Sequence, residues 1–189
     1  FGLIAALSWG IHDILVRYVG QTVGILRSLF LVLVFGAIIQ AVVALAFADF
    51  SRLSSDGVFY SVLAGLLFAV ACIGHYNAFA KGPVKLVAPL IGTYSVAAFL
   101  VAAMFGAPVT ALQWAAVLLL VAGIGLVARS DEADDPLAAE TPLSYVLFYC
   151  ALAIVGFSLT FSFGHKASAT DDALVSGLIT RSTSIVAIG

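Results

Sequence analysis

The sequence predicts an all-α protein, a polytopic transmembrane helical bundle, on three observations. Hydrophobic residues make up 63% of the 189 residues and charged residues only 10%, whereas ordinary soluble domains have about 25% charged residues. Apolar stretches of about 20 residues, the length needed to cross a bilayer, follow one another with short polar breaks. These stretches do not alternate apolar and polar residues, as 115–127 (AAVLLLVAGIGLV) illustrates, and this argues against a transmembrane β-barrel.

The first five spans are expected at residues 1–19, 24–47, 58–80, 86–105 and 112–128. The breaks between them have the composition of turns. A polar segment, 49–57, precedes the third span, Lys81-Gly82-Pro83 ends it, and Gly106-Ala107-Pro108 separates the fourth span from the fifth. Because these connections are short, we expect consecutive helices to pack as neighbours.

An acidic segment follows at residues 129–142 (RSDEADDPLAAETP). It holds five of the ten acidic residues and is interpreted as a solvated linker between two units, 1–128 and 143–189. A sixth span is expected at 143–163, and a truncated seventh begins near Ala173, which makes six full spans plus a truncated seventh. Because the first unit has an odd number of spans, a second copy would enter the membrane from the opposite side, as an inverted repeat.

Composition also excludes several classes of protein. A net charge of -2 offers no basic face for nucleic acid. Cys72 and Cys150 lie far apart in apolar runs, so neither a disulfide framework nor a zinc site is expected. No GxxxxGK motif is present, so the chain is not expected to use ATP.

Polar residues inside apolar spans are the candidates for a binding site, because an ionised side chain at a helix centre costs about 2.5–3.5 kcal/mol on insertion scales. In the first span Trp9, Asp13 and Arg17 are spaced four residues apart on one helix face, with His12 beside them. Asp13 would lie about 9 Å below the membrane surface. It is expected either to face a cavity as a protonatable or solute-contacting acid, or to form a structural ion pair with Arg17 or Arg27.

Connectivity places the ends of the first and third spans on one membrane side, with the starts of the second and fourth. The polar residues gathered there are Arg17, Arg27, His75, Tyr76, Lys81 and Lys85. They form either a basic vestibule for anionic or zwitterionic solutes or, for Arg17 and the two lysines, side chains that reach the lipid head groups.

Polar residues in the fourth and seventh spans are further candidates for a binding site. Arg181 would lie near the middle of the seventh span, where an arginine needs a partner or a wet cavity. Tyr94 and Ser95 follow Pro89 and Gly92 at the centre of the fourth span, where a bent backbone can direct carbonyls to a cavity or the side chains can bond a neighbouring helix. Gln40 is a weaker candidate of the same kind.

Several segments resemble the EamA family of the drug/metabolite transporter superfamily. They are Ser8-Trp9-Gly10, His75-Tyr76-Asn77-Ala78-Phe79-Ala80, Gly82-Pro83-Val84-Lys85-Leu86-Val87-Ala88-Pro89-Leu90, Gln113-Trp114 and Ala122-Gly123-Ile124-Gly125. The resemblance implies ten spans in two inverted five-helix repeats, of which this chain has the first and the start of the second. One position departs from the family pattern: Gly106-Ala107-Pro108 has no acid where the family often has a Gly-Glu pair.

The resemblance implies a secondary active transporter, an exporter or permease of small polar metabolites such as amino acids or drugs. Its expected place is the plasma (inner) membrane of a prokaryote, and its expected partners are a small-molecule solute, the lipid bilayer and a coupling ion such as a proton. The residues expected to contact the solute are Trp9, His12, Asp13, Arg27, His75, Tyr76, Tyr94, Ser95 and Arg181.

Two alternatives stay open. A non-transporting scaffold subunit would lack polar residues that face a cavity. An intramembrane enzyme would need His12, Asp13 and His75 to converge at one depth. Neither catalytic residues nor a cofactor are expected, and no metal centre is expected because His12 and His75 lie on different spans without ligand spacing.

Overall fold

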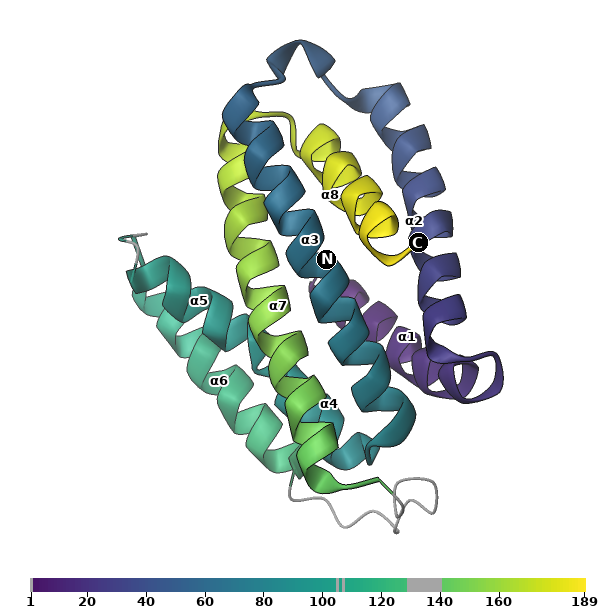
Figure 1. The fold of residues 1–189 in the computed structure, drawn as a ribbon. Helices are drawn as coiled ribbons and strands as arrows, with labels where there is room; N and C mark the ends of the chain where they lie inside the picture. The colour runs from purple at the N-terminus through teal and green to yellow at the C-terminus, as the bar shows by residue number, and fades with distance from the viewer. Residues whose placement is uncertain (1, 105, 107, 129–140) are drawn as a thin grey trace.

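A computed structural model describes residues 2–104, 106, 108–128 and 141–189, and all regular structure in these ranges is helical (Figure 1). The elements are α1 (Gly2–Thr22), α2 (Ile25–Phe47), the 3₁₀ turn η1 (Phe50–Arg52), α3 (Ser55–Lys81), α4 (Val84–Gly92), α5 (Tyr94–Met104), α6 (Ala111–Ala128), α7 (Leu143–Thr170) and α8 (Ala173–Ile188). The predicted fold class, an all-α polytopic membrane protein, is confirmed. Ala107 and the acidic residues expected in the linker (Asp131, Glu132, Asp134, Asp135 and Glu140) lie outside the described residues.

Five stretches of the described chain are long and apolar enough to cross a membrane: Gly2–Thr22, Ile25–Phe47, Ser55–Lys81, Val84–Met104 and Leu143–Thr170. They correspond to the first, second, third, fourth and sixth predicted spans. The expected fifth span forms α6 and the expected seventh forms α8, and both are apolar but shorter than the other five.

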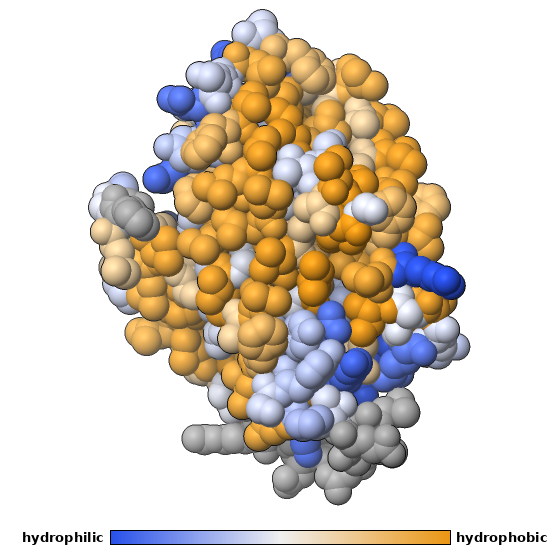
Figure 2. Space-filling model, in the orientation of Figure 1, coloured by the Kyte–Doolittle hydropathy of each residue, from blue (hydrophilic) through white to orange (hydrophobic). Residues whose placement is uncertain are grey.

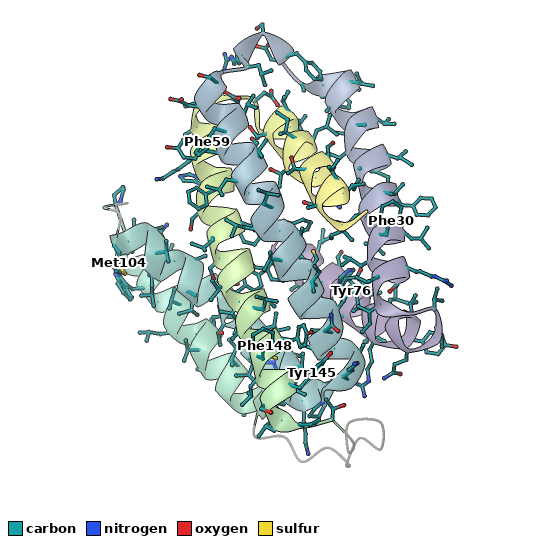
Figure 3. All side chains as sticks on the ribbon, viewed as in Figure 1. Phe30, Phe59, Tyr76, Met104, Tyr145 and Phe148 are labelled. Atoms are coloured by element: carbon teal, nitrogen blue, oxygen red, sulfur yellow. The ribbon has the colours of Figure 1, made fainter. Side chains whose placement is uncertain are left out.

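Large apolar side chains cover the outside of these helices. Phe59 is 62% exposed, Met104 85% and Phe148 61%, and Figure 3 shows them at the periphery of three different helices. Figure 2 shows apolar residues over most of the visible face, with hydrophilic residues gathered towards its upper left and lower right. Such a surface is stable in contact with lipid and unfavourable in water.

The centre of the bundle is the pair α3 and α7, which lie side by side in Figure 1 and make the most extensive contact between any two described helices. Small residues allow their backbones to approach. A Cβ atom on Gly74 would lie 2.7 Å from the Ala153 nitrogen, and one on Gly156 would lie 2.7 Å from Ala71 Cβ. Since lipid tails give no hydrophobic driving force between helices, close packing of this kind holds a membrane bundle together.

The other helices are arranged around this pair. Helix α8 packs against both α2 and α3, while α1 contacts α3 and α2. Helices α4 and α5 pack against α7, and α6 packs against α4. Consecutive helices pack as neighbours for α1–α2, α2–α3, α3–α4, α4–α5 and α7–α8, as expected, but the most extensive contact of α3 is with α7, much further along the chain.

The fourth predicted span is interrupted rather than continuous. Helix α4 ends at Gly92, Thr93 separates it from α5, and Pro89 lies inside α4. The Thr93 hydroxyl donates to the Leu90 carbonyl at 2.6 Å, and the Tyr94 carbonyl accepts from the Ser158 hydroxyl of α7 at 3.0 Å. The break between α4 and α5 thus follows directly after Pro89 and Gly92, and a hydroxyl of α7 reaches a backbone carbonyl beside it.

One end of the bundle is tied by two consecutive aspartates between α7 and α8. Asp171 accepts from the Ser54 backbone N–H at 3.1 Å and from the Ser54 hydroxyl at 2.6 Å. Asp172 accepts from the Asp49 N–H at 3.1 Å and caps α8 through the Leu174 N–H at 2.8 Å. The hydrogen bond from the Asp49 N–H has the largest effect on the pKa of Asp172, followed by that from Leu174. Both lower this pKa because they favour the charged carboxylate. The α2–α3 connection is thus fastened to the α7–α8 connection.

The opposite end of α3 is fastened to α1. The Arg17 guanidinium donates to the carbonyls of Phe79, at 3.0 Å, and Gly82, at 2.6 Å, and the Gln21 amide donates to the Ala80 carbonyl at 3.1 Å. Arg17 therefore lies at the end of the third span, as connectivity predicted. Lys81 lies at the same end, where its ammonium is 4.8 Å from the ring centroid of Tyr145 on α7.

We predict that Gly74→Ala and Gly156→Ala each lower the free energy of unfolding by about 1–3 kcal/mol, because the added methyl group meets the backbone of the partner helix. Thermal unfolding in detergent micelles measures the effect as a lower midpoint temperature. Gly123→Ala on α6 is the control, since a Cβ atom there has no neighbour within 4 Å and alanine favours a helix. Equal midpoints for all three variants would contradict the close α3–α7 contact.

Candidate functional site

A cavity of about 470 Å³ lies between α1, α2, α3, α7 and α8. Its size is within the range of small-molecule sites, roughly 300–1,000 Å³. The lining residues are Ser8, Trp9, His12, Leu29, Val32, Leu33, Gln40, Phe68, Cys72, His75, Tyr76, Phe157, Thr160, Phe161, Gly177, Thr180 and Arg181. Most of this lining is apolar or aromatic, so the few polar side chains decide what the cavity can bind.

The first polar group is a cluster of His12, Asp13 and His75. His12 and Asp13 are neighbours on α1, and His75 comes from α3, which Arg17 holds beside α1. Asp13 Oδ1 lies 3.3 Å from His12 Nδ1 and 3.1 Å from His75 Nε2. The Tyr76 hydroxyl lies 3.5 Å from the other ring nitrogen of His12, Nε2. Figure 3 shows Tyr76 on the side of α3 that faces α1 and α2.

Aromatic rings enclose this cluster. The Trp9 ring meets His12 edge-on at a centroid distance of 5.3 Å, and His75 packs on Phe79 at 4.7 Å and on Phe157 of α7 at 5.8 Å. His75 is only 2% exposed. Among the described residues its Nδ1 has no hydrogen-bond partner, and its Nε2 is close to Asp13 without good hydrogen-bond alignment. Burial of polar atoms without hydrogen bonds is unfavourable and marks the position as unusual.

The second polar group is Arg181 with Gln40, where α8 packs against α2. Arg181 Nε donates to Gln40 Oε1 at 3.2 Å, and the guanidinium carbon lies 5.8 Å from the ring centroid of Phe68. Within the described part of the chain, no carboxylate lies within 4.0 Å of the Arg181 nitrogens. The positive charge therefore faces the cavity without an acidic partner from these residues.

Two glycines lack the side chains that would otherwise fill the space of the Arg181–Gln40 pair. A Cβ atom on Gly36 would clash with the Arg181 guanidinium, and one on Gly177 would clash with the Gln40 amide. Two threonine hydroxyls of the lining are bonded to helix backbone: Thr160 donates to the Gly156 carbonyl at 2.8 Å, and Thr180 donates to that of Ser61 at 3.1 Å. Arg181 and the two histidines are the basic side chains of the cavity lining.

The structure brings together five of the residues expected from the sequence, Trp9, His12, His75, Tyr76 and Arg181, in the lining of one cavity. Asp13 lies just behind the lining, in contact with both histidines. The contacts described for its carboxylate are with these histidines rather than with Arg17 or Arg27.

Three expected residues lie elsewhere. Arg27 is exposed in the first turn of α2, outside the cavity. Tyr94 stacks on Phe161 of α7 at a centroid distance of 5.6 Å, and Ser95 is exposed on α5. Helix α5 begins at Tyr94 and packs against α7, where Tyr94 also contacts the cavity-lining Phe157 at a centroid distance of 5.4 Å.

The cavity also includes groups that sequence reasoning did not select. Gly36 and Gly177 could not be recognised from the sequence, because each makes room for a side chain from another helix, Arg181 and Gln40 respectively. Thr160 and Thr180 looked like ordinary helix residues. Gln40 was only a weak candidate, and its pairing with Arg181 joins residues 141 positions apart.

The enzyme alternative required His12, Asp13 and His75 to converge, and they do. Among the described residues, however, no serine, threonine or cysteine side chain is hydrogen bonded to them as a nucleophile. The scaffold alternative predicted a chain without cavity-facing polar residues, whereas Arg181 and two histidines line this cavity.

Comparison with known proteins gives one match. A family model described as the EamA-like transporter family matches residues 1–129, which is more than half of the chain. No curated protein and no solved structure matches the chain.

We predict that the cavity is water-filled when the protein is in a bilayer. In a background without Cys72 and Cys150, Val32→Cys should react rapidly with a charged thiol reagent, because Val32 lines the cavity. Val42→Cys is the matched control on the same helix: Val42 is 63% exposed but does not line the cavity, so it faces lipid. Labelling is measured by mass spectrometry, and equal rates at the two positions would contradict a wet cavity.

Proposed function

The chain belongs to the EamA-like transporter family and is a membrane transporter rather than an enzyme, and we propose that it is a secondary active carrier of small polar solutes with an anionic group. The solute would bind in the cavity between α1, α2, α3, α7 and α8. The observation that carries this proposal is Arg181, a cavity-lining arginine without a carboxylate partner among the described residues.

An anionic group on the solute explains why an arginine is present there. A cation within a membrane span is costly unless it has a partner or water. Gln40 satisfies one N–H of Arg181, and the terminal nitrogens have no partner among the described residues. A carboxylate or phosphate could accept two parallel hydrogen bonds from these nitrogens, the arrangement that arginine favours.

The rest of the cavity sets the kind of solute. Phe68, Phe157 and Phe161 provide apolar walls, so a solute with an apolar or aromatic body is compatible with them. Asp13 and the two histidines supply a second polar region. A zwitterion such as an amino acid would have its carboxylate at Arg181 and its ammonium group towards these residues.

We propose that transport occurs by alternating access of two inverted units, 1–128 and 143–189, joined by the acidic linker 129–142. On this proposal the chain has six complete spans, with α6 as the fifth, and α8 starts a seventh. The range matched by the family model, 1–129, ends where the linker begins, which supports the division. The cavity has walls from both proposed units, since α7 and α8 follow the linker.

The contacts at the two ends of α3 are candidates for gates. Asp171 and Asp172 join the α2–α3 connection to the α7–α8 connection, and so join the two proposed units. Arg17 and Gln21 close the other end within the first unit. Rocking of one unit against the other requires the aspartate contacts to break. The Asp49–Asp172 bond is exposed and costs little to exchange for water, whereas Asp171 is only 5% exposed and would have to open to water as the units part.

The energy source would be an ion or solute gradient, because the sequence has no nucleotide-binding motif of the GxxxxGK type. A proton is one candidate for the coupling ion, with the His12, Asp13 and His75 cluster as its site. We place the carrier in the plasma membrane of a prokaryote, in line with the family resemblance.

We predict that Arg181→Gln lowers the apparent affinity for the transported solute by about 10- to 100-fold, since charge-assisted hydrogen bonds contribute about 1.5–3 kcal/mol. Flux into proteoliposomes is measured with a panel of labelled amino acids and small carboxylates. Arg181→Lys should restore part of the affinity, because it keeps the charge and loses the paired geometry.

Arg27→Gln is the control for this experiment, since it removes an arginine that is exposed outside the cavity. It should leave flux unchanged. Normal flux with Arg181→Gln at normal protein levels would contradict an anion anchor at this position, and no flux of any solute by the unchanged protein would favour the scaffold alternative.

A further inference from the structure

Three possible metal ligands meet where α1 and α3 approach each other. His12, Asp13 and His75 each offer one ligand atom, and these atoms all lie within 4.8 Å of one another. From the sequence no metal centre was expected, because His12 and His75 lie on different spans without ligand spacing, but the fold brings the three side chains together. The contacts of Arg17 with the Phe79 and Gly82 carbonyls bring them together by fixing α1 along the end of α3.

The distances match a small metal ion. Zn²⁺–N bonds of about 2.0–2.1 Å and tetrahedral angles separate two ligand atoms by about 3.4 Å. Asp13 Oδ1 lies 3.3 Å from His12 Nδ1 and 3.1 Å from His75 Nε2. Two of the three edges of a tetrahedral face therefore already have the required length.

Part of the surroundings also fits. A histidine that binds a metal commonly uses its other ring nitrogen for an outer hydrogen bond, and His12 Nε2 has the Tyr76 hydroxyl at 3.5 Å. His75 is 2% exposed, and its Nε2 lies 3.1 Å from Asp13 Oδ1 without a well-aligned hydrogen bond among the described residues. Its Nδ1 has no outer partner among these residues, so the outer-shell bond is present for His12 alone.

We propose that His12, Asp13 and His75 bind one divalent transition-metal ion of the Zn²⁺ type. Two imidazoles and one carboxylate favour zinc, cobalt, nickel or copper over magnesium and calcium, which prefer oxygen ligands alone. His12 and His75 line the cavity, so the ion would keep an open coordination position towards it. The single carboxylate neutralises only half of the ion's charge, and water can complete the open coordination position. With the ion bound, the cluster would not accept the ammonium group of a zwitterion, so the solute would be held by its anionic group alone.

The first experiment measures metal binding directly, without any transported solute, so its result does not depend on the proposed transport activity. Tag-free protein in detergent is titrated with Zn²⁺ by calorimetry and with Co²⁺ by visible absorption. We expect one ion per chain and the d–d bands of a Co²⁺ ion with nitrogen and oxygen ligands. Absence of saturable binding of both ions would overturn the proposal and leave the cluster as a proton site.

Variants test the ligands. His12→Ala, Asp13→Asn and His75→Gln should each weaken Zn²⁺ binding by more than the roughly 10- to 100-fold typical for loss of an outer-shell partner, and Tyr76→Phe by about that amount. The control is His165→Ala, which removes the chain's third histidine, an exposed residue on α7 far along the chain from the cluster. Loss of binding with His165→Ala, or its persistence in all three ligand variants, would overturn the assignment.

Two further measurements complete the test. Thermal unfolding of each variant without metal shows whether it is folded, and Zn²⁺ should raise the midpoint of the unchanged protein and of His165→Ala but not of the ligand variants. Labelled Zn²⁺ flux into proteoliposomes then distinguishes a transported ion from one that stays bound to the protein. Uptake identifies a transported ion, and saturable binding without uptake identifies a resident one; both outcomes support the site.

Discussion

The close contact of α3 with α7 determines the remainder of the architecture. In lipid the helices gain little from burying apolar surface, so association depends on how closely backbones approach. Gly74, Gly156 and Ala71 make that approach possible, and a Cβ atom on either glycine would meet its partner helix at 2.7 Å. Because α7 follows the expected linker, this contact joins the two proposed units. Helices α1, α2 and α8 then enclose a cavity along one side of the pair, and α4, α5 and α6 occupy the other.

Polar groups in this chain are satisfied in two different ways. Near the helix ends they bond to backbone, as Arg17 does with Phe79 and Gly82, and Asp171 with Ser54. Such contacts fasten the connections between helices. Arg181 and His75 differ because they line the cavity with part of their hydrogen-bonding capacity unmet among the described residues, whereas Asp171, which also has an unpartnered oxygen, lies at the end of the bundle. It is the position beside the cavity, together with the unmet capacity, that marks Arg181 and His75 as candidates for binding.

Much of the fold could be predicted from the sequence because spans are local features. Apolar length located the helices, and Pro89 with Gly92 indicated the place where the fourth span is interrupted. The spacing of Trp9 and Asp13 correctly assigned them to one region of α1. These inferences depend only on residues within one or two helical turns of each other.

Contacts between distant segments could not be predicted in this way. The sequence did not indicate that His75 would meet Asp13, that α3 would pair with α7, or that Gly36 would make room for Arg181. Tyr94 and Ser95 were expected at the site but lie elsewhere. A polar residue at mid-span can bond a neighbouring helix or face lipid as readily as a cavity. Which of these occurs depends on the direction that α5 takes after Thr93.

The position of Gly36 and Gly177 has a consequence for specificity. Both glycines lie beside the Arg181–Gln40 pair, and their missing side chains allow the guanidinium to extend along the cavity wall. A larger residue at 36 would displace the positive charge without replacing Arg181 itself. If the solute binds as proposed, its range can therefore change through small-residue positions on α2 and α8, which set the place of the charge, as well as through the other residues of the cavity lining. The histidine cluster on α1 and α3 is independent of this adjustment, because its geometry depends on the Arg17 contacts at the other end of the bundle.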